Sequence, residues 1–549
     1  MPPVDCRTQR GARSLLNATP FDQLVDSYLD LTWNLDPAAA TAAGVTEYDH
    51  RLALYDEESI RAHGAGFQSV ANSIEALEIE SLDDEIDRTA LLNKIRVTTH
   101  RFTNERTHER NPVFWLGHLL ESLHLLLVFQ DRSPEHVANA LQRRLGEIPA
   151  FLDRARDTLK APPTVFLDTA AQVFAPGVEL IDQVETHCAE AGEDASQEAE
   201  AARGALEAFG KHLEALRDGP TESFAIGQDA FNFRLRFDLA IRQVATEVWR
   251  YGWDLIEQTE AELAALAKSI DGTSAWMDLV ERLRDDHPQA EELVRSYDLH
   301  MQRAKEFVAE HRLLDVPDTA LNVVQTPPFL APLIPFAAYQ PPGTFSDDQS
   351  GWFYVTVPGN GVGDSEKGLR DHCHFDLPTT ALHEGYPGHH LHFVRTNRLP
   401  RRARMVLWSP IMVEGWALYC EEMMAEEGFL SDPRERLFQK VALLWRALRV
   451  VVDVGLHTRE MSVDEAVDLL VDRIGFDRGL ALAEVRRYCA EPVYQASYAL
   501  GRRELLRLRQ SFFEAHGNGE RDKRAFHDAV LAYGGLPPSL ARWGLGLGD

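Results

Sequence analysis

The chain has 549 residues, of which 44% are hydrophobic and 26% are charged, an ordinary composition for a globular protein. It carries 86 acidic residues against 56 lysines and arginines, which gives a formal net charge of −30. This excess of negative charge argues against nucleic acid or an anionic membrane surface as the main partner, because the field of the protein would repel either one.

Cysteine usage and the start of the chain favour a cytoplasmic location. The five cysteines are scattered and include no C-x-x-C pair, which is typical of a reducing compartment. The stretch MPPVDCRTQRGARSLLNATP lacks the apolar region of a signal peptide. No uninterrupted apolar run reaches the roughly 18 residues that a membrane span needs. We therefore expect a cytoplasmic protein with no membrane partner.

Hydrophobic periodicity predicts helix after helix between about residues 20 and 310. In the stretch FDQLVDSYLDLTWNL, apolar residues recur at intervals of three and four, the stripe of an amphipathic helix. Similar stripes occur in LLESLHLLLVF and in FRLRFDLAIRQVATEVW. We expect residues 1–312 to form an N-terminal helical block.

The pattern changes between about residues 313 and 380. Prolines become frequent, and the run WFYVTV at 352–357 is rich in the β-branched and aromatic residues that favour a strand. Helical patterns resume after residue 380 and continue to the end. The sequence therefore predicts a mainly α fold, with a small β element in a C-terminal block at 313–549.

Residues 383–392 read HEGYPGHHLH, four histidines and a glutamate in ten positions. The segment begins like the zinc-protease motif His-Glu-x-x-His, in which two histidines four residues apart face the same side of a helix. Here Pro387 stands at the position of the second histidine, so the helix must break or kink. Only such a distortion lets His389 or His390 join His383 at one metal ion. The spacing alone leaves both histidines open as the second ligand.

A downstream helix supplies a candidate third ligand. The stretch EGWALYCEEMMAEE opens with Glu414, 31 residues after His383. Zinc sites of the His, His, Glu type are completed by such a glutamate and keep one position open. Glu421 and Glu422, on the same predicted helix, have the pattern of a solvated charged face. The two segments together predict a zinc site, although manganese or cobalt would accept the same ligand types.

Several segments resemble a bacterial family known as domain of unknown function 885 (DUF885). The resemblance lies in HEGYPGHHLH, VEGWALYCEE, LRVVVDVGLHTREMSVDEA and RRYCAEPVYQASYALGRRELLRLR. It extends from DPAAATAAGVTEYDHRL to AFHDAVLAYGGLPPSL, and so implies one continuous domain over about 20–545. It further implies a large multi-helix, zincin-like body related in plan to helical zinc metallopeptidases, with a channel between helical blocks. The family has no agreed substrate.

The resemblance also assigns positions. The motifs H-E-x-x-P-G-H, E-G-W and R-Y…Y-x-x-G of the family fall on His383, Glu384, Pro387, Gly388, His389, Glu414, Arg487, Tyr488, Tyr498 and Gly501. This match favours His389 over His390 as the second metal ligand. One departure is plain: where the family usually has Pro-Gly-Gln-Ala, this chain has a longer turn that contains Tyr494, which leaves substrate preference near it open.

Roles in hydrolysis follow from these positions. Glu384 is the candidate general base, because it stands beside the first histidine ligand. Tyr498 is the candidate donor to an oxyanion, since a phenol donates a hydrogen bond without bringing a full charge; a core aromatic is the alternative. Asp453 and His457 lie four residues apart on one predicted helix and would pair. Such a pair would bind the transition state or orient the substrate, or would be a buried structural pair.

These features predict a zinc-dependent hydrolase, a metallopeptidase that cleaves short peptides. Two alternatives stay open. The same metal site could hydrolyse an amide or ester of a small metabolite, or the chain could be a helical binding protein with structural histidines and no metal. The absence of G-x-G-x-x-G after a strand and of a P-loop motif argues against a nucleotide enzyme.

Overall fold

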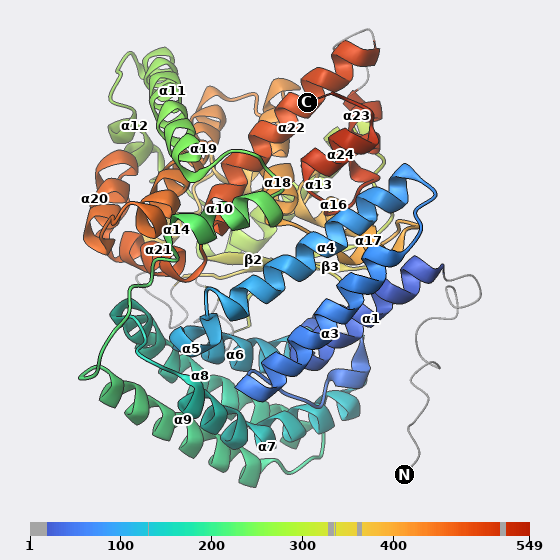
Figure 1. The fold of residues 1–549 in the computed structure, drawn as a ribbon. Helices are drawn as coiled ribbons and strands as arrows, with labels where there is room; N and C mark the ends of the chain where they lie inside the picture. Colours follow the sequence, from blue (N-terminus) through green and yellow to red (C-terminus); the bar gives the residue numbers. More distant parts are fainter. Residues whose placement is uncertain are drawn as a thin grey trace. The chain divides into compact units, whose positions relative to one another are not determined.

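The computed structural model describes residues 19–129, 131–327, 334, 336–358, 365–516 and 523–548. These residues are mainly helical, with one three-stranded sheet, so the predicted mainly α fold is confirmed (Figure 1). The chain divides into two compact units. Unit 1 comprises residues 1–222, 342–349 and 400–406, and unit 2 comprises residues 223–341, 350–399 and 407–549.

Unit 1 is built of helices, several of which begin at a side chain that caps their first free N–H groups. Thr19 and Asp22 form a capping box at the start of the first helix, and Ser81 and Ser133 cap two later helices. The helices of unit 1 are α1 (Pro20–Leu35), α2 (Pro37–Ala42), η1 (Thr46–Tyr48), α3 (Glu57–Ala76), α4 (Leu82–Thr103), α5 (Thr107–Arg110), α6 (Pro112–Val128), α7 (Pro134–Thr158), α8 (Thr164–Glu190), α9 (Ser196–Leu216) and α17 (Arg402–Val406).

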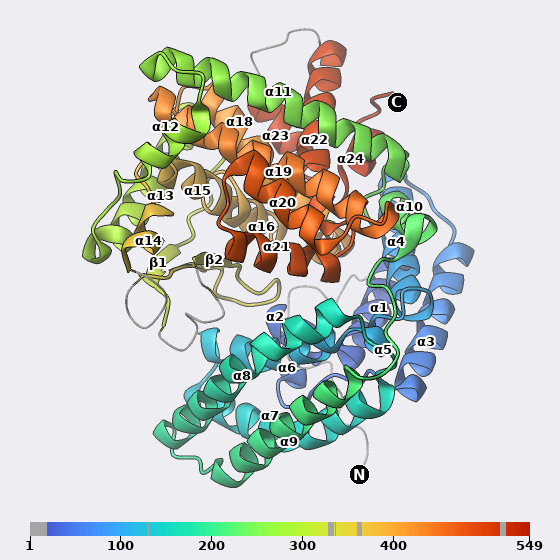
Figure 2. The same cartoon turned by 90° about the vertical axis from the view of Figure 1, so that its left-hand side faces the viewer.

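Helices α6 to α9 pack against one another within unit 1 (Figure 2). By length and composition alone, α8 is apolar enough to cross a membrane. In the structure it packs against α6, α7 and α9, as the core helix of a folded unit does. A single helix that meets only these length and composition criteria is weak evidence for a membrane span, because buried core helices meet them too.

Unit 2 contains the sheet and the remaining helices. Its elements are α10 (Gly227–Phe237), α11 (Ala245–Asp271), α12 (Trp276–Leu283), η2 (Ala290–Glu292), α13 (Leu293–Glu310), β1 (Leu321–Gln325), β2 (Ala337–Gln340), β3 (Gly351–Val355), α14 (Ser365–Arg370), α15 (Leu377–Glu384), α16 (His389–Thr396), α18 (Pro410–Glu426), α19 (Pro433–Thr458), α20 (Val463–Ile474), α21 (Arg478–Ala490), α22 (Tyr494–His516), α23 (Lys523–Leu531) and α24 (Pro538–Gly544).

The division into units differs from the boundary expected at residue 312. Helices α10 to α13 belong to unit 2, where α11 packs along α19 (Figure 2). The short segments 342–349 and 400–406 belong to unit 1 instead. The proline-rich stretch after residue 312 marks a change from helix to strand, and it does not mark the end of a packed unit.

Strand β3 is the middle strand of the sheet. It pairs in parallel with β1, with Val323 opposite Phe353, and antiparallel with β2. The strand predicted from the run at 352–357 is therefore present. Phe353 and Val355 are buried in one hydrophobic cluster with residues of α13 and α15, so the sheet packs directly against the helix that carries the first predicted ligand.

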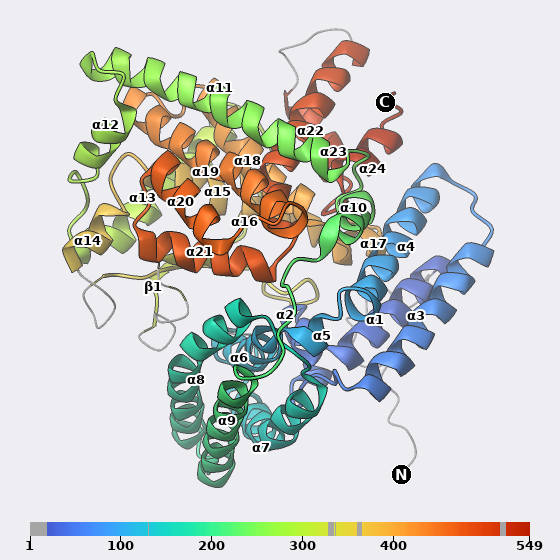
Figure 3. The same cartoon turned by 60° about the vertical axis from the view of Figure 1, so that its left-hand side comes forward.

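Helices α18, α19 and α22 form the centre of unit 2. Nearly every residue of α18 is buried, which explains why its sequence lacks a single apolar stripe. Helices α18 and α22 approach closely at Gly415 and Gly501, because a Cβ atom on either glycine would meet the backbone of the other helix within 2.6 Å. Helices α20 and α21 also pack against α19 (Figure 3).

Candidate metal centre

The helix breaks where Pro387 predicts it should. Helix α15 ends at Glu384, and α16 begins at His389. Gly388, between them, approaches the preceding turn so closely that a Cβ atom would lie 1.9 Å from the carbonyl oxygen of His383. Only glycine fits there, so the Pro-Gly pair brings the start of α16 back over the end of α15.

This break places His389 beside His383, and α18 adds Glu414. Ligand atoms of the three residues all lie within 4.8 Å of one another. The Oε2 atom of Glu414 is 3.4 Å from Nε2 of His389 and 3.9 Å from Nε2 of His383. A tetrahedral zinc ion with bonds of about 2.0–2.1 Å spaces its ligand atoms roughly 3.4 Å apart. The three side chains therefore fit a zinc ion in both chemistry and spacing.

His390 points elsewhere, so the structure brings only one of the two alternative histidines to His383. The Nδ1 atom of His390 lies 3.0 Å from the hydroxyl of Tyr339 on β2, and the histidine is fully buried. His389 keeps 8% of its surface exposed, close to the 6% of His383 and the 7% of Glu414. The three candidate ligands thus share a small solvent-accessible surface that His390 lacks.

Two contacts from neighbouring helices hold Glu414 and α18 in place. The hydroxyl of Tyr494, at the start of α22, donates a hydrogen bond to Oε1 of Glu414, which leaves Oε2 facing the histidines. The indole N–H of Trp416 donates to the carbonyl of Pro387 at 2.8 Å, which joins α18 to the helix break. The contact between Tyr494 and Glu414 was not predicted. The only signal for it in the sequence was the longer turn around Tyr494, which departs from the family pattern.

Glu421 is a second residue that the sequence interpretation missed. It was expected on a solvated face, but it is fully buried, and its Oε1 atom lies 2.8 Å from Nδ1 of His383. A carboxylate on the distal nitrogen fixes the orientation of a metal-binding histidine. The available signal was spacing, because Glu421 lies seven residues, about two helical turns, after Glu414 on the same face. Glu422 pairs with Arg502 instead.

Burial and charge act differently on the two histidines of the cluster. Burial lowers the pKa of His383 to about 3, so its imidazole is neutral, the form that binds a metal. Burial also opposes the charge of His389, but the hydrogen bond and charge of Glu414 outweigh it and raise the pKa of His389. Burial would raise the pKa of Glu414, yet His389 lowers it to about 2. Without a metal, His389 and Glu414 therefore form an ion pair.

Glu384 and Tyr498, the predicted general base and oxyanion donor, lie near this cluster, and neither the carboxylate nor the hydroxyl has a hydrogen-bond partner among the described residues. Glu384 follows His383 directly and is half-buried, and no residue in the described part of the chain hydrogen-bonds to its carboxylate or pairs with it. The ring of Tyr498 lies 5.9 Å from that of Tyr494, and the charge of Glu414 raises the Tyr498 pKa further after burial has raised it. Its hydroxyl has no hydrogen-bond partner among the described residues.

The structure does not bring His457 to the cluster. Its Nε2 atom lies 3.1 Å from the carbonyl oxygen of Tyr488 and 3.9 Å from Asp453, and its ring packs against Phe224 and Phe231. None of these contacts is with a candidate metal ligand, and the catalytic role of His457 stays a prediction. The sequence spacing placed it correctly beside Asp453, but it could not place this part of α19 relative to α15.

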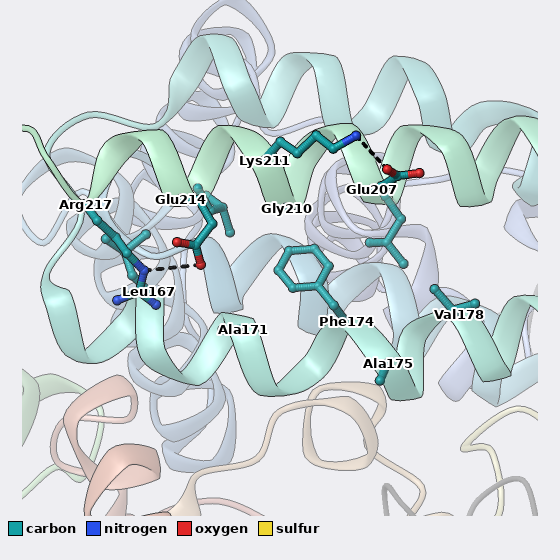
Figure 4. A pocket seen from close by; sticks show the side chains of 12 residues that line it. Leu167, Ala171, Phe174, Ala175, Val178, Glu207, Gly210, Lys211, Glu214 and Arg217 are labelled. Atoms are coloured by element: carbon teal, nitrogen blue, oxygen red, sulfur yellow. Dashed lines mark hydrogen bonds and ion pairs between the residues drawn. The ribbon is translucent and has the colours of Figure 1, made fainter.

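Unit 1 holds a separate hollow of about 430 Å³ between α8 and α9 (Figure 4). Phe174 points across it toward Gly210, and the ion pair of Glu207 and Lys211 lies at its edge. Its lining is mostly apolar and includes none of the predicted site residues. The candidate site therefore rests on the histidine and glutamate cluster of unit 2.

The fold and the cluster define a mainly helical protein with a buried His, His, Glu group that could hold a metal ion. The chain belongs to the DUF885 family: the family pattern described as "Bacterial protein of unknown function (DUF885)" matches residues 37–543. The family resemblance inferred from the sequence motifs is thus confirmed. No curated protein matches the chain.

Two solved structures share the fold. One is a protein of unknown function from Shewanella oneidensis, provisionally described as a lipoprotein; it is 21% identical, with a TM-score of 0.78, and the match covers 96% of this chain and 100% of that one. The other, from Colwellia psychrerythraea and provisionally described in the same way, is 18% identical with a TM-score of 0.82, over 96% and 99% of the two chains. These descriptions contradict the expected cytoplasmic location, which we withdraw.

Proposed function

We propose that the chain is a zinc-dependent hydrolase that cleaves short peptides. The observation that carries this proposal is the convergence of His383, His389 and Glu414 within 4.8 Å, next to a glutamate that has no partner in the described part of the chain. Two imidazoles and one carboxylate leave a fourth position open, as in hydrolytic zinc sites.

Each residue of the site has a distinct task. When bound, zinc supplies Lewis-acid chemistry, because it lowers the pKa of a water molecule to about 7 and polarises a carbonyl group. The Glu384 carboxylate accepts the proton of the attacking water and passes it to the leaving amine. The Tyr498 hydroxyl donates a hydrogen bond to the carbonyl oxygen as negative charge develops there.

The neighbours of the ligands fix their geometry. Glu421 holds the ring of His383 through Nδ1, so that Nε2 faces the centre. Tyr494 binds Oε1 of Glu414 and restrains this carboxylate to present Oε2. Both contacts prepare the site before a substrate arrives, which is the arrangement that electrostatic catalysis requires.

Purified protein incubated with a pool of random short peptides tests this function. We expect peptide cleavage, its loss with a chelator and its return on adding zinc. The same protein is tested in parallel with acylated amines and simple esters, which separates peptidase activity from hydrolysis of a small metabolite. No cleavage of any substrate by zinc-loaded protein, or cleavage that a chelator leaves unchanged, would contradict the proposal.

A further inference from the structure

The turn that leads into α22 contains a strained residue. Val493, directly before Tyr494, has a φ of 72°, in the left-handed region that glycine favours. Among the described residues other than glycine that have a positive φ, it is the one with a β-branched side chain, for which this conformation is most unfavourable. Such a conformation persists only where surrounding contacts hold it. The turn therefore needs a restraint.

Asp453 of α19 supplies this restraint. Its Oδ1 atom accepts the N–H of Val493, and its Oδ2 atom accepts the N–H of Ala496, each at 3.0 Å. These N–H groups belong to the start of α22, where a helix offers no carbonyl partners of its own. Val493 and Asp453 are both fully buried, so an N–H group left without an acceptor there would be costly. The two carboxylate oxygens thus fix the turn to α19.

The same turn places two tyrosines of the candidate site. Tyr494, the residue after Val493, donates its hydroxyl hydrogen to Oε1 of Glu414. Tyr498 lies four residues later, on the same face of α22, with its ring 5.9 Å from that of Tyr494. A change of φ at Val493 would turn the first residues of α22 and carry the Tyr494 hydroxyl away from Glu414. This contact depends on the turn, and the turn depends on Asp453.

We propose that Asp453 is a positioning residue of the candidate metal centre, which acts on Glu414 through the turn and the hydroxyl of Tyr494. The inference rests on the zinc site of the proposed function and extends that site to a residue of α19. The hydrogen bonds of Asp453 are to backbone N–H groups, so its effect reaches the metal by way of α22. A ligand whose orientation is already fixed by a neighbouring group binds metal more tightly. Asp453 should therefore raise the zinc affinity of the chain although it is not a ligand.

A double-mutant cycle on zinc affinity tests this role. Zinc binding to the full chain without a histidine tag is measured by competition with a chelator. We expect Asp453→Asn, in which an amide group replaces one of the accepting oxygens, to weaken zinc binding about tenfold or more, and Tyr494→Phe to weaken it as much. The chain with both changes should bind zinc no more weakly than Tyr494→Phe alone, because the contact through which Asp453 acts is then already absent.

Val493→Gly separates positioning from a general loss of stability. Glycine adopts a positive φ without strain, so the turn no longer needs Asp453. Val493→Gly should restore most of the zinc affinity lost in Asp453→Asn, and it should restore none of that lost in Tyr494→Phe. Asp477→Asn is the matched control, because Asp477 caps α21 through the N–H of Gly479; it should leave zinc affinity unchanged.

Calorimetry shows whether each variant folds, and Asp453→Ser, which keeps one acceptor, replaces Asp453→Asn in the cycle if that chain does not. Unchanged zinc affinity in the folded variant, losses that add in the double variant, or no recovery with Val493→Gly would overturn the inference. Failure of the proposed function is a separate result: a chain that binds zinc with this dependence and cleaves no substrate would lack the activity and keep the positioning residue. A chain that binds no zinc would overturn both.

Discussion

The three carboxylates of the candidate site differ in their surroundings, and these differences assign their tasks. Glu414 is held by Tyr494 and by His389, and the His389 contact lowers its pKa to about 2. Burial raises the pKa of Glu421 to about 7, and this residue contacts the distal nitrogen of His383. Glu384 has neither kind of contact in the described part of the chain, so it is the carboxylate that remains for the proposed proton exchange with a substrate.

Replacing Glu384 tests this assignment. We expect Glu384→Gln to lower the rate of peptide hydrolysis by about 100-fold or more, since general acid–base catalysis contributes that much. Zinc content should stay unchanged, because Glu384 is not a ligand. Glu306→Gln, at an exposed glutamate of α13, is the control and should keep full activity. Activity within a few-fold of the unmodified chain in Glu384→Gln would exclude Glu384 as the base.

Asp453 is the buried acid on α19 whose titration should be visible in stability. It accepts N–H groups of Val493 and Ala496, each at 3.0 Å, and burial raises its pKa to about 7. The folded chain therefore binds this proton more tightly than the unfolded chain, in which the pKa is about 3.9. Its contribution to stability is complete below about pH 4 and is lost as the pH rises through about 7.

Asp453→Asn removes this titration. We expect the thermal midpoint of the metal-free variant to fall less between about pH 4 and about pH 7 than that of the unmodified chain, because asparagine cannot ionise. Scanning calorimetry of both proteins across this range measures the difference. Parallel pH profiles for the two proteins would mean that Asp453 does not titrate in this window.

At the residue scale, the sequence predicted the residues that a local motif specifies. His383, Glu384 and Glu414 follow from motif chemistry, and the family pattern favoured His389. Glu421 and Tyr494 have contacts that depend on how α15, α18 and α22 pack, and packing of distant segments is not encoded in local spacing.

At the scale of elements, the close approach of α18 and α22 positions the site. Gly415 and Gly501 face each other, one residue after Glu414 on α18 and three residues after Tyr498 on α22. Any separation of these helices would therefore move the candidate ligand Glu414 and the proposed oxyanion donor Tyr498 relative to α15.

A single methyl group tests this dependence. In Gly501→Ala, the new Cβ atom would lie 2.0 Å from the carbonyl oxygen of Ile411, so the helices must move apart. We expect a loss of about 1–3 kcal/mol in stability and weaker zinc binding, measured by calorimetry and by competition with a chelator. Gly204→Ala on α9 has no atom within 4 Å of the new Cβ and should leave both properties unchanged. Unaltered zinc affinity in Gly501→Ala would show that the helix contact does not position the ligands.

Periodicity predicted the helices well because burial of one face repeats every three to four residues. It predicted strand β3 but neither β1 nor β2, since these short strands lie among prolines and have no buried residue in their pattern. The unit boundary was also missed, because α10 to α13 have the same helical pattern as the helices of unit 1.

At the scale of the whole molecule, every residue of the candidate centre lies in unit 2. The three ligands come from α15, α16 and α18, so an ion bound to all of them would join these helices. Ligand binding to the folded state alone stabilises that state, and metal binding here would thus couple to the folding of unit 2.

The central claim is the zinc site, and elemental analysis of protein without a histidine tag tests it most directly. We predict about one zinc per chain, lost in His383→Ala and in Glu414→Ala but retained in His390→Gln, because His390 contacts Tyr339 and not the cluster. Absence of metal from the folded unmodified chain after exposure to zinc, or zinc retained in both ligand variants, would contradict the account.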